Sequence, residues 1–327
     1  MLRANVLYRQ ADAAPAPLLV AELRARGFTP SDLPEDAAAR DDTAGDFATP
    51  SPHHARWHGP AGQITITTRH SPHPAADFQG ALNAPWLGAH RGFLSNMVQH
   101  HRASVTLAFA PNDAQGDALA HLRLLHRLIA AQARDSAPMG LFWAPPTQLL
   151  SGAQYNALID DPQPLALFVH PRPKRVGHDS AGRILTQLDL PEAAALIGHH
   201  VRVAPSPLPR ADLLQLAWGF VAHCLASDVL PESGRLLHLK KNLTIEVQRD
   251  LASGGFVLQP RAGRPHTRIG RSKRARAGAP VGRAAAAVFG AAGIVALALA
   301  AWPALTASDM ATSASLDAGV ITIRKID

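Results

Sequence analysis

The sequence predicts an α+β fold: a mixed sheet with two long amphipathic helices and a C-terminal β-meander, followed by a single transmembrane helix. Three observations predict it. Short apolar or alternating segments, typical of strands, are interspersed with helical patterns through residues 1–260. Two longer segments carry apolar residues at helical spacing for about four turns. Finally, residues 284–305 form a run without any charged side chain.

The first part of residues 1–260 contains an acidic and then Pro- and His-rich stretch between its strand and helix patterns. This stretch, 29–60, has the composition of a poorly ordered insert. The elements expected around it are strands at 4–9 and 63–68, a helix at 16–28 that ends at Gly27, and a helix at 83–103 with Asn83 as N-cap.

The second part begins with a strand at 104–111 and a helix from about 113 to 134. Two nearly all-apolar segments, 139–145 and 165–171, predict central strands covered on both faces. A short helix is expected between them. The remaining elements expected are strands at 184–190 and 200–205, a helix at 211–227, and a three-stranded meander at 235–240, 243–248 and 255–260.

Two of these strand–helix segments, 104–131 and 200–227, resemble each other. Each has a strand, a Pro-rich turn, an Asp in the first turn of the helix, and about four turns of helix. An internal duplication explains the match, and so does the chemistry common to βα units.

Charge is distributed unevenly along the chain. Of 32 Lys and Arg and 25 Asp and Glu, residues 1–260 hold 22 of each, whereas residues 261–283 hold eight basic residues and no acid. A nucleic-acid-binding surface would concentrate basic residues on the folded domain, so nucleic acid is not expected as a partner. The single Cys224 excludes an intramolecular disulfide and is interpreted as a buried structural thiol.

Residues 199–260 resemble the C-terminal module of an uncharacterised bacterial family, known only as a domain of unknown function. The resemblance rests on the strand, on a helix leaving through "AHCLASDVLPESG", and on the closing hairpins. The family is expected to carry an Asp-Gly-x-Thr-x-Gly turn where this chain has "PESGRLLHL". The resemblance implies an α+β bacterial domain and supplies no catalytic residue, cofactor or ligand.

The uncharged run 284–305 is interpreted as a membrane anchor. As a helix it would be about 33 Å long, enough to cross a hydrocarbon core of roughly 30 Å. An Ala-rich helix packed on the protein's own core is the alternative. The basic flank predicts a tail-anchored protein of the bacterial inner membrane, with residues 1–260 in the cytoplasm and the tail 306–327 translocated.

The linker 261–283 is predicted to contact anionic lipid headgroups while the span contacts the lipid bilayer. The basic side chains expected to make these contacts are Arg261, Arg264, Arg268, Arg271, Lys273, Arg274, Arg276 and Arg283.

Catalytic and metal-binding motifs are not found. The 17 histidines include three adjacent pairs, but adjacent helical residues point about 100° apart, and no Asp, Glu or Cys completes a ligand set. No nucleophile elbow, P-loop or dinucleotide fingerprint occurs. We therefore predict no catalytic residue, no metal site and no cofactor.

One binding surface is proposed from the sequence. The stretch 168–183 is cation-rich and leaves the end of an apolar strand, where α/β proteins often place ligands. A solvated connection is the alternative explanation. The residues proposed for this binding loop are Trp143, His170, Arg172, Lys174 and Arg175.

The sequence thus predicts a tail-anchored membrane protein whose cytoplasmic domain acts as a binding module for an unidentified protein partner. The alternative is a membrane-tethered, hydrolase-like enzyme in which the fold brings His and Asp residues together. Two or more titratable groups within hydrogen-bond reach in a pocket would favour the enzyme.

Overall fold

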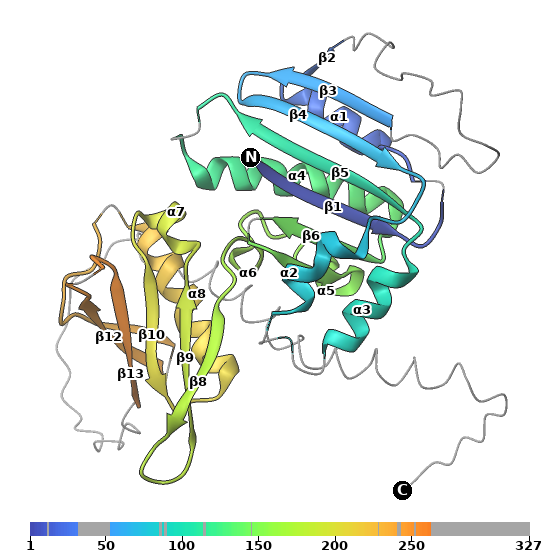
Figure 1. Cartoon of the computed structure of the whole chain (residues 1–327). Helices are drawn as coiled ribbons and strands as arrows, with labels where there is room; N and C mark the ends of the chain where they lie inside the picture. Colours follow the sequence, from blue (N-terminus) through green and yellow to red (C-terminus); the bar gives the residue numbers. More distant parts are fainter. Residues whose placement is uncertain are drawn as a thin grey trace, which may run out of the picture. The chain divides into compact units, whose positions relative to one another are not determined.

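Two β-sheets, each with helices packed against it, make up the described part of this chain (Figure 1). The computed structural model describes residues 1–11, 13–31, 53–84, 87, 90–113, 116–144, 146–227, 229–240, 243–251 and 253–262. These residues belong to one compact unit.

The first sheet has seven strands in the order β2-β3-β4-β5-β1-β6-β7, and every neighbouring pair is antiparallel. The strand nearest the N-terminus, β1, therefore lies between two strands that follow it by about a hundred residues or more. The strands are β1 Leu2–Tyr8, β2 Thr29–Ser31, β3 His53–Gly59, β4 Gly62–Arg69, β5 Ala103–Pro111, β6 Gly140–Ala144 and β7 Gln148–Ser151.

One face of this sheet is apolar and packs against helices α1 (Pro17–Ala25) and α4 (Ala118–Ser136), which lie behind the strands in Figure 1. The alternation of β4 shows why: Gly62, Ile64, Ile66 and Thr68 are buried, and the residues between them are not. Helix α4 begins where the Asp117 side chain accepts hydrogen bonds from two backbone N–H groups of its first turn, as an N-cap does.

The opposite face is only partly covered. The 3-10 helix η2 (Ala75–Phe78) and helices α2 (Gln79–Leu82) and α3 (His90–His100) lie over the end of the sheet formed by β1, β6 and β7. The apolar side chains buried there are Leu7, Phe78, Ala81, Leu82, Leu94, Met97, Val98, Phe142 and Leu149. The rest of this face, on β3, β4 and β5, is polar.

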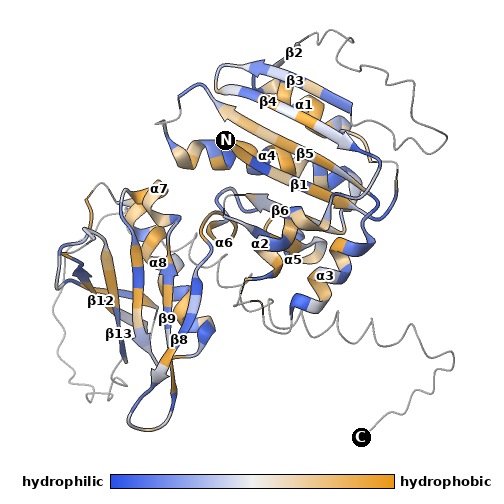
Figure 2. Cartoon of the chain, viewed as in Figure 1, coloured by the Kyte–Doolittle hydropathy of each residue, from blue (hydrophilic) through white to orange (hydrophobic). Residues whose placement is uncertain are grey.

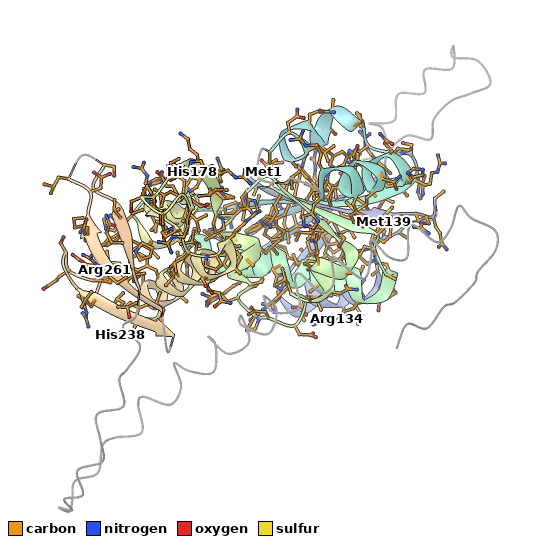
Figure 3. The ribbon with its side chains drawn as sticks, turned by 90° about the horizontal axis from the view of Figure 1, so that it is seen from below. Met1, Arg134, Met139, His178, His238 and Arg261 are labelled. Carbon is orange, nitrogen blue, oxygen red and sulfur yellow. The ribbon has the colours of Figure 1, made fainter. Side chains whose placement is uncertain are left out.

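The second sheet has six strands in the order β11-β12-β13-β10-β9-β8. All neighbours are antiparallel except β10 and β13, which are parallel. Helix α8 (Arg210–Ala226) packs on this sheet, and α7 (Ala193–Ile197) contacts α8. The strands are β8 Arg172–His178, β9 Ile184–Leu190, β10 Val201–Ser206, β11 Leu236–Lys240, β12 Leu243–Arg249 and β13 Phe256–Ala262. In Figure 3, Arg134 and Met139 mark the part of the chain around the first sheet, and His238 and Arg261 mark the second sheet.

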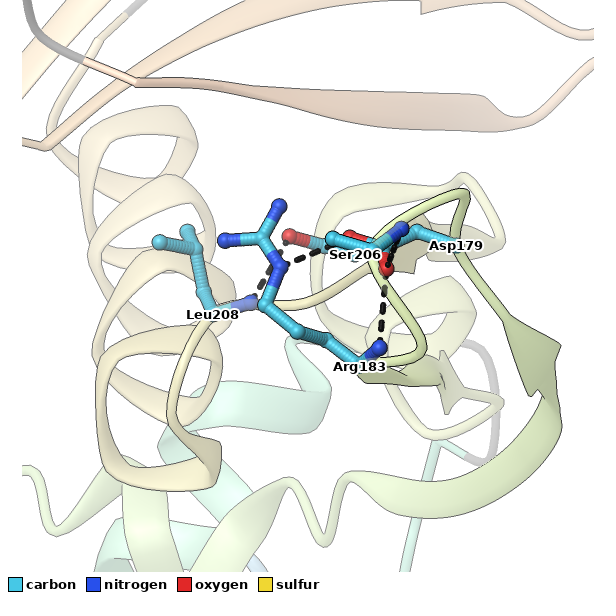
Figure 4. Close-up of polar contacts among 5 residues, drawn as sticks. Asp179, Arg183, Ser206 and Leu208 are labelled. Atoms are coloured by element: carbon cyan, nitrogen blue, oxygen red, sulfur yellow. Dashed lines mark hydrogen bonds and ion pairs between the residues drawn. The ribbon is translucent and has the colours of Figure 1, made fainter.

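The hairpin of β8 and β9 is closed by one carboxylate. Asp179 Oδ1 accepts hydrogen bonds from the backbone N–H groups of Ala181 and Arg183 at 2.9 and 2.8 Å, and its Oδ2 pairs with the Arg183 guanidinium at 2.7 Å (Figure 4). These hydrogen bonds hold the pKa of Asp179 below its usual value, first through the backbone N–H of Arg183. The turn is thereby fixed although it is exposed.

The two sheets share an order of elements. In the first, the hairpin β3–β4 is followed by short helices, then β5 and the long helix α4; in the second, the hairpin β8–β9 is followed by α7, then β10 and the long helix α8. In both, the third strand pairs antiparallel with the second strand of the hairpin. The two strand–helix segments that resemble each other in sequence thus occupy corresponding places.

The predicted fold class is wrong in two respects. There are two sheets rather than one, because β8 turns back onto β9 and not onto the first sheet. In addition, no helix within the described residues is long and apolar enough to cross a membrane. The transmembrane helix in the predicted fold class, and the description of the protein as a tail-anchored membrane protein, are therefore wrong for the part of the chain that the structure describes. The predicted linker beyond residue 262, the span 284–305 and the tail 306–327 lie outside the described residues.

Smaller corrections concern individual elements. The apolar segment 165–171 contains a short helix, α6 (Leu165–Phe168), and not a central strand. Part of the expected insert 29–60 forms β2 and β3, and 32–52 lies outside the described residues. Asn83 ends α2 and does not begin a helix. Helices α4 and α8 and the antiparallel meander β11–β12–β13 confirm their predictions.

Candidate functional site

One side of the first sheet carries two rows of mostly polar side chains, which together we call the polar face. Its members on β3 and β4 are exposed or half-buried, whereas Thr106 and Asn5 are buried. Because side chains directly opposite each other in paired strands lie on the same side of the sheet, the register defines both rows. One row, across β3, β4, β5 and β1, consists of Arg56, Thr65, Ala108 and Arg3. The next row, across the same strands, consists of His54, Thr67, Thr106 and Asn5.

Side-chain contacts agree with this register. His54 Nδ1 lies 3.0 Å from the hydroxyl of Thr67, its cross-strand neighbour. The guanidinium carbon of Arg3 lies 6.0 Å from the centre of the Phe142 ring, a cation–π contact on the same side of the sheet as Asn5. Arg69, two residues beyond Thr67 on β4, also belongs to this side. The pKa of His73 is lowered chiefly by burial, and the positive charge of Arg69 contributes in the same direction.

The polar face is positively charged. Arg3, Arg56 and Arg69 belong to it, whereas none of the seven strands of this sheet contains Asp or Glu. The ion pairs found within the described ranges involve other arginines and leave these three out. Three cations are thus gathered on one surface of a region, 1–260, whose total charge is zero.

At the boundary between this face and the covering helices, the carboxylate of Asp77, the imidazole of His73 and the hydroxyl of Thr106 are linked by hydrogen bonds. His73 Nδ1 donates to Asp77 Oδ2 at 3.2 Å, and its Nε2 accepts from the Thr106 hydroxyl at 3.4 Å. The His73 side chain is 8% exposed and that of Asp77 is 39% exposed. Burial is the largest cause of a lowered His73 pKa and outweighs the hydrogen bond to Asp77, which raises it.

A second histidine holds this arrangement in place. His101 Nε2 accepts a hydrogen bond from the backbone N–H of His73 at 2.8 Å, and its Nδ1 donates to the backbone carbonyl of Val98. These two bonds fix a neutral ring with the proton on Nδ1, and burial lowers the pKa of His101. His101 therefore ties the segment before η2 to the end of α3.

Two polar side chains beneath these helices have no hydrogen-bond partner within the described residues. They are the amide of Asn5, with both Oδ1 and Nδ2, and the hydroxyl of Ser104, and both residues are fully buried. Asn5 is the cross-strand neighbour of Thr106, so it lies next to the His73 contacts. Such groups are rare in native cores because they lose their hydration without replacement, and a functional role is one of the explanations for them.

The structure places the residues of the predicted binding loop in different elements. Trp143 is fully buried on β6 and stacks on Phe168, with ring centres 6.1 Å apart. Arg172, Lys174 and Arg175 are exposed, but on the edge strand β8 of the second sheet and not on a loop. Arg172 pairs with Glu192 at 2.7 Å. Burial lowers the pKa of His170, between the two sheets in sequence, to about 4.

Of the predicted lipid contacts, the structure describes only Arg261. Arg261 lies on β13, and its guanidinium pairs with the carboxylate of Glu246 on the neighbouring strand β12. The other seven, Arg264, Arg268, Arg271, Lys273, Arg274, Arg276 and Arg283, lie outside the described residues. Cys224 is buried, as expected of a structural thiol, and burial raises its pKa to about 12.

Compared with protein-family models, with curated proteins and with solved structures, the chain matches none of them. The resemblance of 199–260 to a bacterial module stays a prediction. In the ranges that the structure covers, no group of three or more His, Cys, Asp or Glu side chains is placed to hold a metal ion.

The polar face could not be found from local motifs. Arg3, Arg56 and Arg69 are far apart in sequence, and only the pairing of β1, β3, β4 and β5 brings them together. One signal was available: in β4 the polar residues Gln63, Thr65, Thr67 and Arg69 alternate with buried ones, which indicates a strand with one polar side.

Proposed function

We propose that this protein is a binding module that holds an anionic partner on the polar face of its first sheet. The observation that carries the proposal is the set of three arginines, Arg3, Arg56 and Arg69, on a sheet whose strands contain no carboxylate. Arginine binds carboxylates and phosphates through paired N–H groups, and the neighbouring threonine hydroxyls add further donors.

The test uses the full-length chain and a fluorescently labelled oligoglutamate peptide, with binding followed by anisotropy. The triple variant R3Q/R56Q/R69Q should bind at least about tenfold more weakly, since it removes the charge of the face. The matched control, R24Q/R91Q/R127Q, changes three exposed arginines on helices and reduces the net charge by the same amount. An equal loss in both variants would assign the binding to net charge and reject the site.

A second candidate function, a hydrolase, is supported by the order Asp77–His73–Thr106. This order matches an acid that orients an imidazole and an imidazole that activates a hydroxyl. Two features favour binding instead. Thr106 is 9% exposed, and β5 is paired on both sides, so the backbone N–H groups around Thr106 are committed to the sheet and are not free to stabilise an oxyanion.

The two functions separate in one experiment. A hydrolase of this kind would cleave activated esters such as p-nitrophenyl acetate, and both H73Q and T106V would abolish the cleavage. A binding module would show the same slow background rate in the wild type and in both variants.

A further inference from the structure

We infer that the anionic group held on the polar face is the phosphate monoester of a phosphorylated serine or threonine in a segment of a partner protein. The inference rests on the proposed function and specifies its ligand. It depends on the arginine row, formed by Arg56, Thr65, Ala108 and Arg3.

The first argument is the number of hydrogen-bond donors. Each guanidinium carries five N–H groups, and the Thr65 hydroxyl between the two arginines adds another donor. A carboxylate offers two oxygens and one negative charge. A phosphate monoester offers three oxygens and a charge of about −1.5 to −2 at neutral pH, so it matches two guanidinium groups in charge and in acceptors.

The second argument is the space between the arginines. Arg3 and Arg56 are three strand positions apart, roughly 14 Å between their backbones at about 4.8 Å per strand. The position next to Arg3 is Ala108, whose side chain is a single methyl group and is half-buried. The Arg3 guanidinium lies over the Phe142 ring of β6, on the other side of β1 from Ala108. To close over a group seated above Ala108 and Thr65, Arg3 would leave that ring and swing across β1, while Arg56 approaches from β3.

The third argument concerns the kind of molecule that carries the phosphate. Sites for small ligands are concave and enclose most of their ligand. The arginine row instead extends across four strands, and each of its members is exposed or half-buried on the side of the sheet seen uncovered in Figure 2. The second row adds His54 and Thr67, which offer imidazole and hydroxyl groups beside the arginines. A polypeptide segment can contact both rows together.

The experiment measures the affinity of the full-length protein for three pools of short labelled peptides with randomised flanks. The pools differ only in the central residue, which is phosphoserine, serine or glutamate. We expect the phosphoserine pool to bind about tenfold or more tightly than the other two. R3Q, R56Q and A108L should each remove this preference, because they take away one clamp or fill the space between the clamps.

The variants R24Q and R127Q serve as controls and should keep the preference. Equal binding of the glutamate and phosphoserine pools would overturn the inference and leave the proposed function standing. If none of the pools binds, both fail. If free phosphoserine or inorganic phosphate competes as well as the peptide pool does, the phosphate comes from a small molecule and the assignment to a protein segment is overturned.

Discussion

The side-chain amide of Gln132 donates a hydrogen bond of 2.8 Å to the hydroxyl of Tyr8, joining the C-terminal part of α4 to the end of β1. The same amide donates to the backbone carbonyl of Ala14 at 3.0 Å and accepts from the backbone N–H of Ala16 at 2.8 Å. Gln132 is fully buried, and all its polar atoms are paired. It fixes the connection between β1 and α1 against the long helix.

Replacing Gln132 by leucine should therefore destabilise the protein. The substitution leaves the buried N–H of Ala16 without a partner and removes one of the two side-chain partners of the Tyr8 hydroxyl, and the part-buried carbonyl of Ala14 loses its donor. We expect a loss of about 2–4 kcal/mol in the free energy of unfolding. Urea denaturation measures it. Q99L, at an exposed position of α3, is the control and should change the free energy little; a comparable loss there would contradict this account.

Asn5 is the opposite case. Its amide is as buried as that of Gln132 but has no partner among the described residues. Asn5→Leu, which removes the polar atoms and keeps a similar volume, should raise the free energy of unfolding by about 1–3 kcal/mol. Urea denaturation again measures the effect. A marked loss of stability would show that the amide is hydrogen-bonded after all, for example to an internal water.

His126 should make stability depend on pH. Burial is the largest cause that lowers its pKa from 6.5 to about 4, against the hydrogen bond to the Asp161 carbonyl, which raises it. Below pH 6.5 His126 therefore binds a proton in the unfolded chain, whereas in the folded chain it stays neutral until the pH approaches 4. Stability should fall as pH decreases from about 6.5 to about 4, by up to about 3 kcal/mol from this residue.

The measurement is chemical denaturation of the wild type and H126Q at several pH values between 4 and 7. H126Q should be less stable at pH 7, because Tyr155 and the Asp161 carbonyl lose a partner, but its stability should fall less on acidification. H100Q changes an exposed histidine on α3 and should keep the wild-type slope. Parallel curves for the wild type and H126Q would contradict the assignment.

The N-cap of α4 gives a smaller prediction. Asp117 Oδ1 accepts hydrogen bonds from the backbone N–H groups of Leu119 and Ala120 at 2.9 and 3.1 Å. Asp117→Ala should lower the thermal midpoint, at a cost of about 1 kcal/mol, because the two donors lose their partner. Asp117→Ser preserves a capping oxygen and should recover most of the loss, so equal midpoints for the two variants would show that the cap contributes nothing.

Sequence reasoning predicted elements whose burial follows a period. The strand at 63–68 and the two long helices show clear apolar patterns, and each forms as predicted. The strand predicted at 165–171 is wrong, because a short apolar run has no periodicity that distinguishes a strand from a buried helix, and residues Leu165–Phe168 form a short helix. The composition of 29–60, acidic and then Pro- and His-rich, predicts a poorly ordered insert and hides β3, because only Trp57 among the seven residues of this strand is buried.

The candidate site was harder to predict than the fold, and the reason is physical. Its arginines belong to three different strands, and their proximity depends on pairings between residues that are distant in sequence. The Asp77–His73 contact is local, at i and i+4, but the third member, Thr106, comes from β5. Charge totals could not reveal the site either, because acids elsewhere cancel its arginines.

The position of β1 between β5 and β6 also delays folding of this sheet while the chain is being translated. Leu2 pairs with Phe109, 107 positions further along the chain, and Leu7 pairs with Gly140. At about 5–20 residues per second, β1 must wait roughly 5–20 s for its first neighbouring strand to be translated. During that time the apolar segment Val6–Tyr8 has no sheet to join, so this topology leaves a hydrophobic segment of the nascent chain exposed until β5 is available.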